Sequence, residues 1–226
     1  MATTAGNLQA IRRRIENAAR AARRAPDSVT LLAVSKTHPA GLIEEAAAAG
    51  QKAFGENYVQ EAVEKMNALR GLEWHLIGPL QSNKTRLAAE RFDWIQTLAS
   101  EKIARRLSEQ RPARRAALNV LIQVNVSGEA SKSGVAPAEV AALARAIAPL
   151  PRLRLRGLMA IPEPGAAPER YRAARRLFDE LEQELAFDTL SMGMSDDLEL
   201  AIAEGATLVR IGSAIFGARK NVRSAA

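Results

Sequence analysis

The sequence predicts a single closed (β/α)8 barrel of the TIM type, with an extra helix before the first strand. Eight short runs with strand character alternate with longer alanine- and leucine-rich segments, as in parallel strand-helix units. The length of 226 residues suits a small barrel. No glycine-rich GxGxxG turn follows the first strand, which disfavours the alternative fold, a doubly wound open sheet.

The N-terminal segment, residues 1–27, predicts a helix that packs on the barrel. Leu8, Ile11 and Ile15 form an apolar stripe at helical spacing. Because no linker is apparent, we expect residues 1–226 to form one domain. Alanine-interleaved arginines occupy the rest of the helix and predict a solvated face; they are Arg12, Arg13, Arg14, Arg20, Arg23 and Arg24.

The eight strands are expected in regular order along the chain. The first contains the apolar run 31–34, which suits a strand buried on both faces. A helix should follow over residues 39–49, because proline is tolerated in a first helical turn and Gly50 can take a positive φ. The strand ranges are 29–35, 52–56, 73–78, 92–98, 118–126, 153–161, 187–194 and 206–212.

Polar residues follow the predicted strands, and in a parallel barrel the loops at the strands' carboxyl ends form the functional site. The set combines a lysine, an arginine, amides and hydroxyls, without the carboxylate pair of a glycosidase. It indicates an anionic ligand that carries a carbonyl group. The residues are Lys36, Glu56, Asn57, Gly78, Gln81, Ser82, Asn83, Asn125, Ser127, Met159, Ser195, Arg210, Gly212 and Ser213.

Two segments after the last two strands predict a phosphate site. In SMGMSDDLELAIAEG we expect a helix over residues 196–204, with Asp196 and Glu199 at the spacing of a capping box. In VRIGSAIFGAR, Gly212 allows the backbone to approach a ligand closely and Ser213 adds a hydroxyl. Barrels of this type often hold phosphate in the loops after strands seven and eight.

Composition excludes several other classes of function. Cysteine is absent and only two histidines are present, so disulfides are excluded and a structural metal is not expected. The absence of a signal-peptide core and of a membrane-length apolar run predicts a cytoplasmic protein. The net charge of +7 raises the alternative of nucleic-acid binding, which the 4% aromatic content disfavours.

Three ring residues in predicted strands are expected to be structural. His75 lies inside a strand, so we expect a satisfied core or barrel-lumen histidine. Trp74 and Trp94 are expected to pack against the helices.

Seven motifs, in order along the chain, closely resemble those of the pyridoxal 5′-phosphate homeostasis proteins, the YggS/PROSC family. The resemblance covers residues 28–218. It implies a barrel similar to the N-terminal domain of alanine racemases, which binds pyridoxal 5′-phosphate (PLP) as a lysine aldimine. The motifs are AVSKTH, FGENYVQEAVEK, WHLIGPLQSNK, QVNVSGEASKSG, LRGLMAIP, LSMGMSDDLELAI and RIGSAIFGAR.

The same resemblance implies a set of cofactor-binding residues. A guanidinium has only donors, so a pyridine nitrogen that faces it stays unprotonated and the ring is a weak electron sink. The set comprises Lys36 as the Schiff-base lysine, Arg210 as the partner of the ring nitrogen, Ser195, Gly212 and Ser213 as phosphate ligands, and Asn57 and Met194 as further contacts.

The resemblance implies a PLP carrier and regulator in vitamin B6 homeostasis rather than an enzyme. The alternative is a slow amino-acid racemase that acts through the same lysine. Alanine racemases use a tyrosine base that a second domain and a partner subunit bring. We expect no such second domain in this sequence of 226 residues, and neither Tyr58 nor Tyr171 lies in a substitute motif. We expect a monomer that contacts PLP-dependent apo-enzymes transiently, with Lys132 and Lys220 as secondary amines in PLP transfer.

Overall fold

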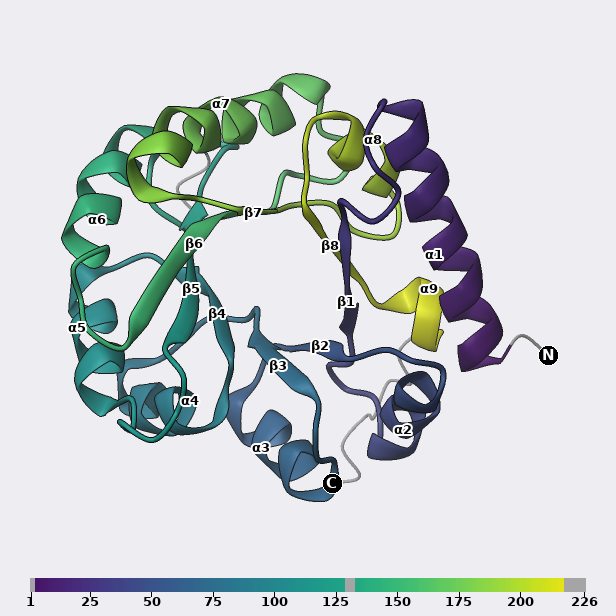
Figure 1. Ribbon diagram of the computed structural model, residues 1–226, viewed down its shortest axis with the longest axis horizontal. Helices are drawn as coiled ribbons and strands as arrows, with labels where there is room; N and C mark the ends of the chain where they lie inside the picture. Colours follow the sequence, from purple (N-terminus) through teal and green to yellow (C-terminus); the bar gives the residue numbers. More distant parts are fainter. Residues whose placement is uncertain (1–2, 129–132, 218–226) are drawn as a thin grey trace, which may run out of the picture.

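The computed structural model, which describes residues 3–128 and 133–217, contains a closed barrel of parallel strands. Neighbouring strands pair in chain order, and the first strand pairs with the last, with Thr30 opposite Leu208 (Figure 1). The predicted barrel is therefore confirmed, and the open-sheet alternative is wrong. The strands are β1 (Thr30–Val34), β2 (Ala53–Glu56), β3 (Glu73–Leu76), β4 (Trp94–Leu98), β5 (Leu118–Val124), β6 (Leu153–Ala160), β7 (Thr189–Ser191) and β8 (Leu208–Ile211).

Helices surround the barrel as an outer ring (Figure 1). The second helix begins after Pro39 and ends before Gly50, whose φ is 84°, as the sequence predicts. The helices are α1 (Thr4–Ala21), α2 (Ala40–Ala48), α3 (Val59–Ala68), α4 (Thr85–Arg91), α5 (Glu101–Gln110), α6 (Val140–Ile147), α7 (Pro168–Leu185), α8 (Leu198–Ala203) and α9 (Ser213–Phe216), with 3-10 turns at Ser82–Lys84 and Pro137–Glu139.

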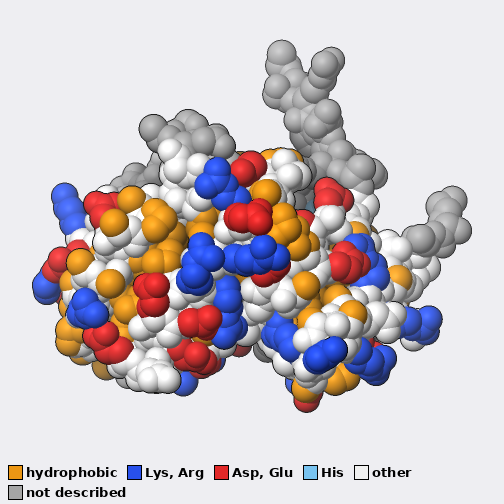
Figure 2. All heavy atoms as spheres, turned by 90° about the horizontal axis from the view of Figure 1, so that it is seen from above, with side chains coloured by type: hydrophobic (Ala, Val, Ile, Leu, Met, Phe, Trp, Pro, Cys, Tyr) orange, Lys and Arg blue, Asp and Glu red, His pale blue; other side chains and the backbone are white. Residues whose placement is uncertain are grey.

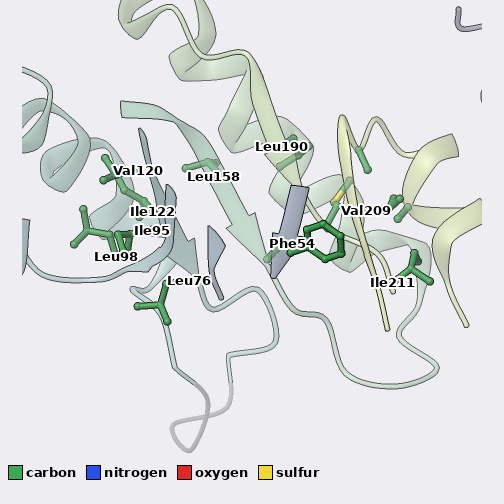
Figure 3. Close-up of a cluster of buried hydrophobic side chains, with 14 of the residues drawn as sticks. Phe54, Leu76, Ile95, Leu98, Val120, Ile122, Leu158, Leu190, Val209 and Ile211 are labelled. Carbon is green, nitrogen blue, oxygen red and sulfur yellow. The ribbon is translucent and has the colours of Figure 1, made fainter. Parts of the chain in front are cut away.

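The main hydrophobic core lies between the strands and the helices. Residues two apart on a strand share a face, and pairs such as Val120 with Ile122, and Val209 with Ile211, are buried in this layer (Figure 3). Trp74 belongs to the same layer, 5.8 Å from the ring of Phe54 between ring centroids. The outward faces of the strands thus hold the helices in place.

The barrel interior holds smaller apolar clusters and a set of buried polar side chains. Trp94 clusters with Leu121 and Met159, and its ring stacks on that of His75 at 4.9 Å. The prediction that Trp94 packs against the helices is wrong, because the alternation along β4 turns Ile95 toward the helices and Trp94 inward. His75 is 1% exposed, which confirms the prediction of a lumen histidine.

Helix α1 packs against α2, α8 and α9 and buries the predicted stripe of Leu8, Ile11 and Ile15. The prediction that its arginines only face solvent is wrong in part. Arg12 donates to the carbonyl oxygen of Ala49, and Arg24 donates to those of Ile202 and Ala206. These bonds satisfy carbonyl groups at the ends of α2 and α8, so the arginines help to attach α1 to the barrel.

The molecular surface over α7 and α8 carries basic and acidic side chains interspersed (Figure 2). Ion pairs on these helices include Arg172 with Glu204 and Arg175 with Asp179. On this face the excess of positive charge is therefore not concentrated in a uniform basic patch of the kind that a polyanion prefers.

Candidate functional site

A cavity of about 330 Å³ opens among the carboxyl ends of the strands. Its volume falls within the usual range for small-molecule sites. It brings together all seven residues predicted as cofactor contacts, from loops far apart in the sequence. The lining comprises Val34, Lys36, His38, Asn57, Ile77, Ile161, Met194, Ser195, Asp196, Arg210, Gly212, Ser213 and Gly217.

Lys36 lies in the tight turn that joins β1 to α2. The turn begins where Ser35 N donates to the carbonyl oxygen of Gly55, and it closes where His38 N donates to that of Ser35. Thr37 has a φ of 65°, which is unusual for a β-branched residue. Its N–H donates to Glu61 Oε1 at 2.6 Å, so a side chain of α3 holds this conformation.

A buried charge cluster lies beneath this turn. Lys65 Nζ donates to the Ser35 carbonyl oxygen, to Glu56 Oε1 and to Glu61 Oε1, at 2.7–2.8 Å. Ser35 Oγ also donates to Glu56 Oε1, at 2.6 Å. Burial raises the pKa of Glu56, while the charge of Lys65 opposes that rise. Glu56 thus supports the lysine turn rather than lining the cavity.

The sequence prediction missed the role of Lys65. The available signal was the four-residue spacing of Glu61 and Lys65 on one helix, directly after a strand that ends in Glu56.

The loop after β7 presents Met194 and Ser195 to the cavity. Met194 N donates to Asp197 Oδ1 at 2.6 Å, and the Tyr171 hydroxyl donates to Asp197 Oδ2 at 2.5 Å. Burial and the neighbouring Asp197 raise the pKa of Tyr171, so the hydroxyl keeps its proton. From outside the barrel, Arg14 donates to the Ser195 carbonyl oxygen at 3.2 Å.

The predicted helix over residues 196–204 is wrong at its start, because α8 begins at Leu198. The carboxylate of Asp197 binds Met194 N, which holds residues 194–197 in a turn. The predicted capping box does not form either, since Asp197 is the N-cap residue and Glu199 pairs with Arg14.

The loop after β8 places a second serine beside the first. Ser213 Oγ lies 3.5 Å from Ser195 Oγ, so two hydroxyls face the same part of the cavity. A Cβ on Gly212 would lie 3.1 Å from the carbonyl oxygen of Val34. The glycine therefore allows this loop to pack closely against β1.

Arg210 is the cation at the base of the cavity and is 4% exposed. Its Nη1 donates to Ser191 Oγ at 2.8 Å, and its Nη2 donates to the carbonyl oxygen of Ala160 at 2.9 Å. Burial lowers the pKa of Arg210 to about 10, still well above neutrality, so the guanidinium stays charged. Among the described residues its remaining N–H groups form no further hydrogen bond, so they can donate to a ligand acceptor.

Asn57 has a buried Oδ1 with no hydrogen-bond partner in the part of the chain that the structure describes. Buried polar atoms are rarely left unpaired, so this oxygen favours a ligand donor nearby. With an amine, a guanidinium and two hydroxyls in one cavity, the donors and acceptors fit a phosphorylated aldehyde with a ring nitrogen. Gly78 keeps Asn57 in place, because a Cβ there would lie 2.2 Å from the Asn57 carbonyl oxygen.

Several predicted strand-end residues do not line the cavity. Met159 lies in the barrel interior with Trp94, and Ser127 donates to Glu163. Lys132 and Lys220 fall outside the described residues. The others that lie away from the cavity are Glu56, Gly78, Gln81, Ser82, Asn83 and Asn125.

The cavity also contains residues that the sequence prediction missed. His38 lies two residues after Lys36, and its ring centroid is 5.2 Å from that of Phe216. Its position in the sequence, two residues after Lys36, was the signal that could have placed it in the cavity. Ile77 and Ile161 add an apolar wall from the ends of β3 and β6.

Known proteins share both the sequence and the fold. The protein-family model named "Alanine racemase, N-terminal domain" matches residues 6–220 of this chain. The pyridoxal phosphate homeostasis protein of Pseudomonas aeruginosa is 59% identical over 223 residues, covering 97% of each chain. The protein of the same name from Escherichia coli K12 is 56% identical, covering 95% of this chain and 96% of its own.

Solved structures agree with these matches. PipY of Synechococcus elongatus, solved with PLP bound, is 41% identical with a TM-score of 0.77, covering 90% of this chain and all of its own. The alanine racemase of Corynebacterium glutamicum shares the fold at 20% identity and a TM-score of 0.71, covering 96% of this chain and 63% of its own. The chain belongs to the pyridoxal phosphate homeostasis protein family and contains the alanine racemase N-terminal domain.

Proposed function

We propose that this protein binds PLP covalently through Lys36 and acts as a carrier and regulator in intracellular PLP (vitamin B6) homeostasis. One observation carries the proposal: a lysine, a buried arginine and two facing serine hydroxyls converge on one cavity. The names of the relatives and the PLP-bound structure of PipY support it.

Each loop contributes a separate part of the binding site. Ser195 and Ser213 would donate their hydroxyl protons to the phosphate, and Gly212 would let the backbone of the last loop approach it. Lys36, in the opposite loop, would hold the aldehyde end of PLP through its Nζ. Asn57 and Met194 would contact the cofactor between these two ends.

Arg210 determines what the bound cofactor can do. PLP supplies an aldehyde that bonds to amines and a ring that withdraws electrons best when its nitrogen is protonated. Arg210 can only donate hydrogen bonds. A ring nitrogen that faces it would therefore accept a hydrogen bond and stay unprotonated. This arrangement favours a protein that stores and delivers the aldehyde rather than one that catalyses a reaction strongly.

The positions of the tyrosines also disfavour the racemase alternative. Tyr58 is 58% exposed, and the Tyr171 hydroxyl donates to Asp197. Neither tyrosine of this chain lines the cavity. A two-base racemisation would therefore need a second proton-transfer group other than these tyrosines.

The wider setting of the protein is part of the same proposal. We infer a single-domain, cytoplasmic monomer that meets PLP-dependent apo-enzymes transiently and uses neither nucleic acid nor membrane as a partner. The described ranges contain no helix that is both long and apolar enough to cross a bilayer. Lys132 and Lys220 stay predicted as secondary amines in PLP transfer. The test of that role is the transfer of PLP to an apo-enzyme by a protein in which both lysines are substituted.

Visible absorbance tests the binding proposal. Protein incubated with PLP and then freed of unbound PLP should show an absorbance band that borohydride bleaches, and K36A treated in the same way should lack this band. The exposed Lys52 supplies the control K52A, which should behave like the wild type. A wild-type protein that takes up no PLP would contradict the proposal.

Function as a carrier is tested separately. The PLP-loaded protein should activate an apo-enzyme while producing little D-alanine from L-alanine. Rapid racemisation would instead support the enzyme alternative.

A further inference from the structure

A chain of hydrogen bonds runs through the barrel interior from Arg210 toward the opposite mouth. Arg210 Nη1 lies 2.8 Å from Ser191 Oγ, which lies 2.7 Å from Gln96 Oε1. Gln96 Nε2 lies 2.8 Å from His75 Nδ1, and His75 Nε2 lies 2.8 Å from Glu73 Oε1. The first four side chains are at most 4% exposed, and buried polar groups of this kind are normally hydrogen-bonded to one another.

The arginine end fixes the direction of every bond in the chain. A guanidinium only donates, so Ser191 Oγ accepts from it and gives its own proton to the Gln96 oxygen. The amide nitrogen of Gln96 therefore donates to His75 Nδ1. That leaves the proton of His75 on Nε2, where it is donated to the carboxylate of Glu73.

The direction of these hydrogen bonds helps to stabilise the positive charge of the buried Arg210 guanidinium. In the described ranges Arg210 forms no ion pair, and its two partners there are a hydroxyl and a carbonyl group. The charge of Asp197 favours the cation, but that carboxylate already accepts bonds from Met194 N and Tyr171. A polarised chain that ends on a carboxylate offers further compensation.

Glu73 stands at the other mouth of the barrel. It begins β3, and its side chain is 49% exposed. It lines a second cavity of about 260 Å³ together with the first residues of four other strands, Thr30, Trp94, Thr189 and Leu208. The hydrogen bond from His75 lowers the pKa of Glu73, so the carboxylate is charged at neutral pH.

We propose that Ser191, Gln96, His75 and Glu73 are positioning residues that hold the Arg210 guanidinium toward the cofactor ring nitrogen and balance its charge from the far mouth. The proposal rests on the proposed function, which assigns Arg210 to that nitrogen. The chain then sets how strongly Arg210 donates to the ring, and thus the electronic state of the cofactor, through residues that never touch it.

Nitrogen NMR of the protein loaded with ring-¹⁵N-labelled PLP tests this directly. In S191A and Q96L the ring ¹⁵N resonance should move away from its wild-type position toward that of a nitrogen without a hydrogen bond. The dissociation constant for PLP should rise roughly tenfold, as expected for a weakened bond to a charged group. E73Q should shift the resonance in the same direction by less, since an exposed charge is screened.

A matched control comes from another buried strand glutamine. Gln123 lies in β5, is 7% exposed, and donates to the Ser133 carbonyl oxygen rather than joining the chain. Q123L should keep the wild-type resonance. S191A, which removes a single oxygen, supplies the result even if Q96L fails to fold.

The outcomes separate the two proposals. A wild-type resonance and affinity in S191A, with PLP still bound at Lys36, would overturn the positioning chain alone. A wild-type protein that binds no PLP would overturn the proposed function and this inference with it.

Discussion

At the scale of single residues, the lysine turn depends on a charge cluster that does not line the cavity. Lys65 connects the Ser35 carbonyl oxygen to Glu56 and Glu61, and Glu61 in turn accepts from Thr37 N. The two residues that flank Lys36 are therefore both held by this cluster. Removing the cation leaves the buried carboxylate of Glu56 without its charged partner.

We expect K65M to lower the free energy of unfolding by roughly 3–5 kcal/mol, the usual effect of breaking a buried ion pair. Urea denaturation measures this loss. K102M, which changes an exposed lysine of α5, is the control and should stay within about 0.5 kcal/mol of the wild type. A K65M protein as stable as K102M would show that the cluster does not stabilise the turn.

His75 makes stability depend on pH in a definite direction. Burial lowers the pKa of His75 in the folded protein below its ordinary value of 6.5. As pH falls below 6.5, the unfolded chain therefore binds a proton that the folded protein does not, and stability is lost. Above that pH the contribution of His75 is fully present.

The free energy of unfolding of the wild type should therefore decrease between pH 7 and pH 5. H75Q keeps a donor and an acceptor without a titrating group, so its decrease should be smaller over the same range. Urea titrations of the two proteins at matched pH values measure the difference. Parallel pH profiles would contradict a lowered pKa.

At the scale of elements, α1 supports from outside the barrel the two segments that carry Ser195 and Ser213. Arg14 donates to the Ser195 carbonyl oxygen, and Asn7 donates to that of Ile215 in α9. The helix thus contacts both serine-bearing loops. Its surface ion pair, Arg14 with Glu199, contributes little to stability by itself, because both side chains are well exposed.

We therefore expect R14M to weaken PLP binding by roughly two- to tenfold while changing the unfolding free energy by no more than about 1 kcal/mol. R20M is a matched control on the same helix, because the ion pair that Arg20 forms within the described residues is a local one, with Glu16. Absorbance titration with PLP gives both dissociation constants. Equal affinities of R14M and R20M for PLP would show that Arg14 does not support the loop that carries Ser195.

The loop after β7 also depends on a glycine. Gly193 has a φ of 96°, and a Cβ there would lie 2.5 Å from the Cβ of Ala201 in α8. Gly165 has a φ of 72° but open space around it. The two positions therefore share the backbone strain that alanine introduces and differ in the steric clash.

G165A should cost about 1–2 kcal/mol of stability, the usual penalty for a left-handed non-glycine residue. G193A should cost more and should also weaken PLP binding, because the clash displaces the turn that carries Ser195. Thermal unfolding and PLP titration of both variants measure these effects. Equal losses in the two proteins would contradict the role of close packing at Gly193.

At the scale of the whole molecule, the sequence predicts the barrel well because strand burial and turn residues are local signals. The apolar run before Lys36 and the flanking Pro39 and Gly50 suffice to place β1 and α2. The direction in which a buried strand side chain points is not local, because both faces are apolar. The sequence therefore does not determine that Trp94 faces the barrel interior.

The same limit applies to the site. The resemblance indicated the residues of the cavity, and the barrel topology explains why they meet there. The supporting contacts could not be predicted, because Lys65 under the turn and Arg14 behind the loop join segments that are remote in the sequence. Such contacts follow from the closed arrangement of the strands and helices rather than from any motif.

The most direct test of this account is the position of the covalent bond to PLP. The loaded protein is reduced with borohydride and digested, and mass spectrometry then locates the modified lysine. The pyridoxyl label should lie on Lys36 in the wild type and should be absent in K36A. A label on any other lysine of the wild type, with Lys36 unmodified, would contradict it.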